Sequence, residues 1–191
     1  RLTDHLEEEV SALDNEIPAV LCAHVNISGA KTASERSMML GNDHVLSLGT
    51  VAIPQFDYVA LGNIHKYQVL TQNPPVVYAG SIERVDFSEE REDKGFVIVE
   101  IDPSKPQGQR LVSYEFVAID ARPMLTIDVP TRPSDDPTET TLEAISKHEG
   151  KGLERSIVRL RINMGAEQEP AFRESAVRQA LASAFHVAGI E

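Results

Sequence analysis

The sequence predicts a mixed α/β (α+β) fold, and three observations lead to this class. Short apolar runs such as residues 19–25 and 56–62 are typical of buried strands. Other segments carry an apolar residue every three or four positions, which is typical of helices with one buried face. The chain has 191 residues, 41% of them apolar, which is enough for one full core or two small ones.

The first 120 residues predict one helix and several strands. Residues 3–17 form the helix, which Pro18 ends. Cys22 lies within the apolar run 19–25, which we expect to be a strand buried on both faces. Further strands are predicted at 56–62 and 76–80, and an antiparallel pair at 95–101 and 110–117, joined by a connection of turn residues.

The pattern changes near residue 120, so we place domains at 1–120 and 121–191. In the second, residues 124–129 predict a strand, and Asp136-Pro137 predicts the start of a helix. Strict alternation over 156–163 predicts a half-exposed strand, and Pro170 is expected to open another helix. This order suggests a small two-layer α/β unit.

Composition excludes several classes of protein. No apolar run approaches the length needed to span a bilayer, and the start does not resemble a signal peptide. Cys22 is the only cysteine, so no internal disulfide can form. We therefore expect a cytoplasmic protein without membrane contact. The net charge of −12 argues at first against nucleic acid as a partner, and −10 of it lies in residues 1–120, which hold 9 basic and 19 acidic residues.

Two histidines at predicted strand ends are the sharpest candidates for a site. His24 ends one apolar strand, and His65 follows another. Catalytic and metal-binding groups gather outside the carboxyl ends of strands in α/β sheets, and imidazole binds Zn, Mn and Fe. Asn63 alternates with His65 and points the same way on an extended segment. The alternative is that both imidazoles simply bond nearby carbonyl groups.

Three other groups of polar residues are weaker candidates, and two of them leave two interpretations open. Ser81 and Arg84 follow a strand and are suited to a phosphate, but the stretch also fits an ordinary turn. Arg159 and Arg161 share one face of a strand, which suits DNA backbone contact or a solvent-facing surface. The stretch 41–44, Gly-Asn-Asp-His, reverses the last two residues of a metallophosphoesterase signature, and we interpret it as a loop turn.

Together these segments resemble the SbcD family of DNA repair nucleases, bacterial relatives of the meiotic recombination nuclease. The likeness covers residues 17–120, and more loosely 121 to the end. The segments that carry it are residues 21–30 (LCAHVNISGA), 56–66 (FDYVALGNIHK), 75–87 (PVVYAGSIERVDF) and 94–96 (KGF).

The resemblance implies a calcineurin-like metallophosphoesterase sandwich followed by a capping domain. It implies a double-strand exonuclease and single-strand endonuclease that hydrolyses DNA with two Mn²⁺ ions, in repair, recombination and replication. His24 and His65 would then be metal ligands, whereas Asn63 stands where the family has a histidine. The implied partners are DNA, the SMC-like ATPase subunit SbcC and a second copy of the chain. Bound cations would also reconcile the acidic charge with a DNA substrate.

Other motifs of the family, Asp-x-His, Gly-Asp-x-x-Asp and Gly-Asn-His-Asp, do not occur in the sequence. We therefore expect the chain to be the carboxyl-terminal portion of such a nuclease, without catalytic residues of its own and inactive in isolation. Two other functions remain open. One is a non-catalytic DNA-positioning or partner-binding scaffold, and the other is a phosphoesterase for small molecules, which the capping domain disfavours.

Overall fold

The computed structural model describes residues 2–32 and 45–191, so the stretch 41–44 lies outside the described residues. The chain forms two compact units. The first runs to residue 83 and includes 92–121; the second comprises 84–91 and 122–191. Residues 84–91 therefore belong with the second unit although they precede the last two strands of the first.

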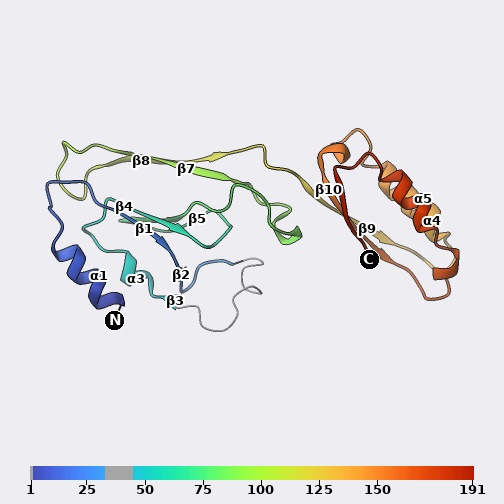
Figure 1. Ribbon diagram of the computed structural model, residues 1–191, viewed down its shortest axis with the longest axis horizontal. Helices are drawn as coiled ribbons and strands as arrows, with labels where there is room; N and C mark the ends of the chain where they lie inside the picture. Colours follow the sequence, from blue (N-terminus) through green and yellow to red (C-terminus); the bar gives the residue numbers. More distant parts are fainter. Residues whose placement is uncertain (1, 33–44) are drawn as a thin grey trace. The chain divides into compact units, whose positions relative to one another are not determined.

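A four-stranded sheet forms the centre of the first unit (Figure 1). Its order is β1 (Val20–His24), β4 (Tyr58–Gly62), β6 (Pro75–Tyr78) and β5 (Gln68–Gln72). The first three strands are parallel, and β5 is antiparallel to β6. The short strands β2 (Asn26–Ile27) and β3 (Val45–Leu46) pair beside it.

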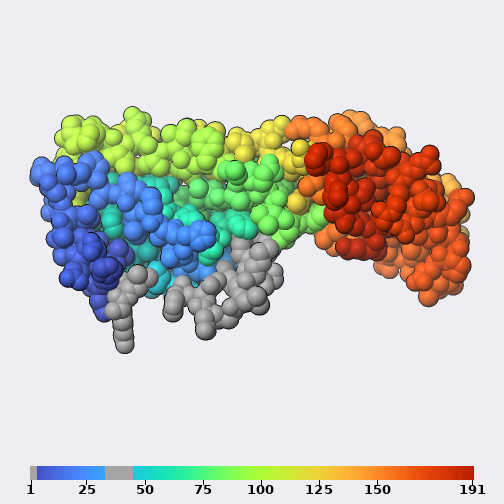
Figure 2. Space-filling view, in the orientation of Figure 1, coloured from blue at the N-terminus to red at the C-terminus, as the bar shows by residue number. Residues whose placement is uncertain are grey.

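The two faces of this sheet are covered differently, because alternate side chains of a strand point to opposite sides. Val59 and Val76 face the helices α1 (Leu2–Ser11) and α3 (Leu48–Val51) in one apolar core. On the other face, Tyr58 and its neighbours line a cavity of about 330 Å³ beneath a hairpin. That hairpin consists of β7 (Gly95–Ile101) and β8 (Leu111–Ala118) and forms one long side of the first unit in Figure 2.

The second unit is a three-stranded parallel sheet with two helices (Figure 1). Along the chain it contains β9 (Met124–Pro130), α4 (Pro137–Ser146), β10 (Ile157–Asn163), α5 (Glu174–Ala180) and β11 (His186–Ile190). β10 lies between β9 and β11. Ile145, Leu160 and Val177 are fully buried between sheet and helices. Short 3₁₀ turns occur at Phe87–Glu89, Leu153–Arg155 and Glu169–Ala171.

The structure corrects several local expectations. α1 ends at Ser11 rather than at residue 17, and Ile17, which the predicted helix included, is 60% exposed. β1 is not buried on both faces: Val20, Cys22 and His24 are exposed, and the residues that alternate with them are half-buried. Pro170 lies in a 3₁₀ turn rather than at the start of α5. No helix among the described residues is long and apolar enough to cross a membrane.

Candidate functional site

The carboxyl ends of β1 and β4 bring His24 close to the segment that carries Asn63 and His65. The two strands are parallel, and His24 pairs in register with Gly62, the last residue of β4. A Cβ atom on Gly62 would lie 3.0 Å from His24 Nδ1, so the missing side chain leaves room for the imidazole. His24 therefore lies against the residue that leads directly into Asn63.

Asn63 has a structural contact that the sequence did not reveal. Its φ is +95°, a left-handed conformation that Asn adopts more readily than most residues. Its side-chain amide donates to Asn26 Oδ1 at 2.7 Å, and Asn26 is buried. The amide of Asn63 thereby joins the bend after β4 to the start of β2.

Tyr78, the last residue of β6, contacts the backbone around Asn26. Its hydroxyl donates to the Val25 carbonyl at 2.7 Å and accepts from the Ile27 amide at 3.0 Å. Burial raises the pKa of Tyr78, partly offset by the bond from Ile27, so the hydroxyl remains a donor at neutral pH. The backbone on both sides of Asn26 is thus held in place.

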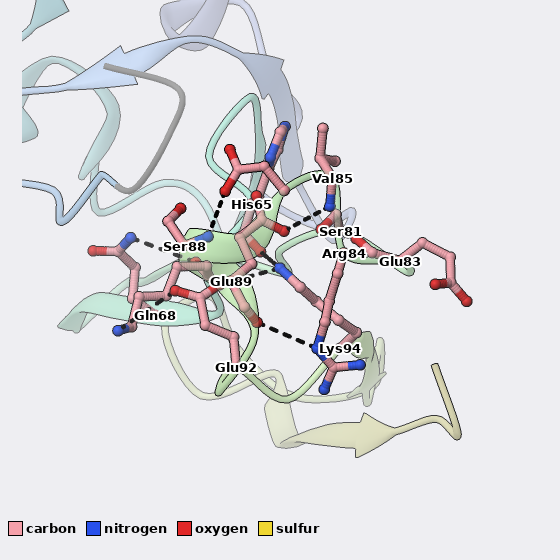
Figure 3. A network of polar contacts seen from close by, with 12 residues as sticks. His65, Gln68, Ser81, Glu83, Arg84, Val85, Ser88, Glu89, Glu92 and Lys94 are labelled. Atoms are coloured by element: carbon pink, nitrogen blue, oxygen red, sulfur yellow. Dashed lines mark hydrogen bonds and ion pairs between the residues drawn. The ribbon is translucent and has the colours of Figure 1, made fainter. Parts of the chain in front are cut away.

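The backbone of His65 is held at its carbonyl oxygen (Figure 3). This oxygen accepts from the Ser81 amide at 3.0 Å and from Lys94 Nζ at 3.1 Å. Lys94 also contacts Glu92 Oε2 at 3.1 Å. No local pattern predicts this arrangement, since Lys94 lies 29 positions after His65.

The donor set suits a transition metal only in part. His24 and His65 supply imidazoles, and Asn63 supplies an amide, which are acceptable to Mn²⁺. Within residues 2–32 and 45–191, however, no group of three or more His, Cys, Asp or Glu side chains could hold a metal ion. The described residues therefore do not complete a metal centre by themselves.

Ser81 and Arg84, the two residues predicted to suit a phosphate, both make local contacts. Ser81 belongs to the first unit, where its hydroxyl donates to the Glu83 carbonyl at 2.7 Å. Arg84 belongs to the second unit, where Nε donates to the Glu89 carbonyl at 3.2 Å and an Nη to the Arg122 carbonyl at 3.1 Å. The guanidinium of Arg84 therefore holds together main-chain segments of the second unit.

Arg159 and Arg161 do share one face of β10, but their surroundings differ. Arg161 binds both carboxylate oxygens of Asp128, at 2.8 and 3.0 Å, and this pairing raises the pKa of the guanidinium. Arg159 lies over the Phe87 ring, 4.4 Å from its centre, and donates to Thr126 Oγ1 at 3.2 Å. The buried Nε of Arg159 has no hydrogen-bond partner in the part of the chain that the structure describes.

A polar cavity of about 320 Å³ lies within the second unit beside these arginines. The side chains around it include three cations and two anions. They are Arg91, Arg159 and Arg161 with Glu90 and Asp128. Asp128 neutralises Arg161, whereas Arg159 has no carboxylate partner among the described residues.

Comparison with known proteins identifies one region of similarity. No protein-family model matches the chain. The chain is 32% identical over 129 residues to the SbcD subunit of the nuclease SbcCD from Staphylococcus epidermidis. The matched region makes up 67% of this chain but only 32% of that protein. This similarity agrees with the resemblance to the SbcD family that the strand-end motifs carry.

Proposed function

We propose that the chain is the carboxyl-terminal portion of an SbcD-like nuclease subunit that acts in DNA repair. The observation that carries this proposal is the juxtaposition of His24 with the Asn63–His65 segment at the carboxyl ends of β1 and β4. The similarity to a nuclease subunit supports it independently. Under this proposal, the first unit belongs to a calcineurin-like sandwich and the second to a capping domain.

In this function His24 and His65 contribute ligands to a manganese centre that hydrolyses phosphodiester bonds of DNA. A bound metal pair would polarise the phosphate and supply a nucleophilic hydroxide. This chain's residues contribute positioning: Gly62 leaves room for His24, and Asn63 ties its turn to Asn26. The proposed partners are DNA, an SbcC-like ATPase subunit and a second copy of the subunit.

We propose that the isolated chain does not cleave DNA. It matches only 32% of the length of its relative, and its described residues hold no complete metal centre. The assay is incubation of the purified chain with duplex DNA and Mn²⁺. Cleavage that is lost on His65→Ala substitution would contradict this part of the proposal.

The nuclease assignment itself is tested in a chimera that carries this chain in place of the corresponding part of the Staphylococcus epidermidis protein. We expect the chimera to degrade linear duplex DNA with Mn²⁺, and His65→Ala to reduce the rate by at least about a hundredfold. His186→Ala is the matched control, because His186 is an exposed residue of β11. Equal rates for the two variants would refute a role for His65.

A second candidate function is a DNA-positioning scaffold that uses the second unit. The observation in its favour is Arg159, which lines the polar cavity of the second unit and has no carboxylate partner among the described residues. Phosphate contacts release counterions, so Arg159→Ala is expected to lower the salt slope of duplex binding by about one. Arg161→Ala serves as the comparison, because Asp128 already pairs with Arg161. A salt slope unchanged by Arg159→Ala would remove that arginine from DNA contact.

A further inference from the structure

The carbonyl group of His65 is held from two sides by residues of the first unit (Figure 3). The Ser81 amide, just after β6, donates to it at 3.0 Å. Lys94 Nζ, just before β7, donates to it at 3.1 Å. Because a carbonyl oxygen has two lone pairs, these two donors use its full capacity.

Lys94 is among the most deeply buried side chains in the described residues. The residue is 1% exposed, and its side chain is completely inaccessible to solvent. An ammonium group in such a position is costly unless it is paired and hydrogen-bonded. Glu92 supplies a compensating negative charge: its Oε2 lies 3.1 Å from Lys94 Nζ, and its Oε1 lies 3.7 Å from Lys66 Nζ.

Two glycines allow close backbone contacts beside this carbonyl: Gly80 next to the His65 segment and Gly95 next to β8. Gly80 has φ +81°, and a Cβ there would lie 2.7 Å from the His65 carbonyl oxygen. A Cβ on Gly95 would overlap the Val117 carbonyl oxygen of β8. The Lys94 carbonyl also accepts from the Ile119 amide at 2.9 Å. The Lys94 backbone is therefore anchored to the hairpin, and its ammonium reaches the His65 carbonyl.

We infer that Lys94 is a positioning residue for His65. Its ammonium, balanced by Glu92, holds the carbonyl of His65 and so restricts the backbone from which the imidazole extends. Lys94 acts through this carbonyl and takes no part in chemistry. That Lys94 thereby orients a metal ligand rests on the proposed function. That it restricts the His65 backbone rests only on the hydrogen bonds.

The test uses the 191-residue chain and amide hydrogen exchange followed by NMR. In Lys94→Met, we expect the Ser81 amide to exchange about tenfold faster, because the His65 segment, no longer held by the charged donor, opens more readily. We also expect the His65 ring to give broadened or multiple ¹H–¹³C signals. Lys94→Arg, which keeps a charged donor, is expected to restore a single signal and most of the protection.

Two comparisons separate positioning from general destabilisation. Lys105→Met makes the same change at an exposed lysine of the β7–β8 connection and is expected to leave both readouts unchanged. In Lys94→Met, amides in the centre of β4 and β6 are expected to keep their relative protection. Unaltered Ser81 exchange, a uniform loss across the sheet, or failure of Lys94→Arg to restore the signal would each overturn the inference.

Addition of Mn²⁺ tests the proposed function separately. A paramagnetic ion broadens nearby resonances, so in the unsubstituted chain we expect the His24 and His65 ring signals to broaden before that of His186. If they do not, the two histidines do not bind Mn²⁺ in the isolated chain, and the His65→Ala chimera decides their metal role. The exchange results still decide whether Lys94 positions His65.

Discussion

At the scale of single residues, the buried charge of Arg110 makes several contacts in the first unit. Arg110 is 2% exposed and donates from Nε to the Lys105 carbonyl at 2.9 Å and from an Nη to the Ile17 carbonyl at 3.0 Å. The same guanidinium lies 3.8 Å from Asp57 Oδ2, which accepts from the Ala19 amide at 2.9 Å. These bonds join the hairpin to the chain that enters β1.

Arg110→Met is expected to destabilise the first unit by about 3 kcal/mol, since it leaves buried carbonyls and Asp57 without their cation. Urea denaturation provides the measurement. Arg132→Met, at an exposed arginine of the second unit, is the matched control and should change stability by less than about 0.5 kcal/mol. A similarly small effect at Arg110 would show that its contacts contribute little.

Tyr58 predicts how the stability of the first unit depends on alkaline pH. Burial, with smaller contributions from Tyr67 and Tyr114, raises the pKa of Tyr58 to about 12. Above pH 10 the unfolded chain loses this proton first, so stability falls as the pH rises from 10 to 12. The loss is at most about 2 kcal/mol. Tyr58→Phe should show a shallower decline over this window, and parallel curves for the two proteins would contradict the assignment.

At the scale of elements, local sequence patterns determine some helices and strands, whereas contacts with distant parts of the chain determine others. The start of α4 was predicted from Asp136-Pro137, and the structure confirms it. Asp136 Oδ1 accepts from the Thr138 amide at 2.8 Å and from the Glu139 amide at 3.1 Å. The hairpin β7–β8 was also predicted, because its turn residues lie between two apolar runs.

Asp136→Ala is expected to lower the stability of the second unit by about 1 kcal/mol, because two amide groups lose their acceptor. Asp136→Asn keeps a side-chain oxygen and should retain most of that stability. Circular dichroism during urea titration distinguishes the two variants. Equal losses for Ala and Asn would show that the charge, rather than the capping oxygen, matters here.

Strands β5 and β11 were not predicted from the sequence. β5 has polar residues at both ends and becomes a strand because the antiparallel β6 supplies its hydrogen bonds. β11 pairs with β10 across a register shift between Val158 and Arg159. In both cases the stabilising partner, rather than the local pattern, determines the conformation.

At the scale of the whole molecule, each unit has its own apolar core. Leu160, in the centre of β10, is fully buried in the second core. Leu160→Ala is expected to cost about 2–5 kcal/mol, because it removes buried atoms and leaves a cavity. Hydrogen exchange should show reduced protection in β9, β10 and β11, with β4 and β6 unaffected. Equal loss in both units would mean that they unfold together.

The sequence by itself determined the fold class, most strands, the α4 cap and the position of two histidines at strand ends. These features depend on alternation, apolar runs and turn residues within short stretches of chain. Only the tertiary structure decided the exposure of Cys22 and the bond between Asn26 and Asn63. It also decided the hydrogen bond from Lys94 to the His65 carbonyl. Such contacts join residues tens of positions apart, and their energies depend on burial and partners that appear only when strands assemble.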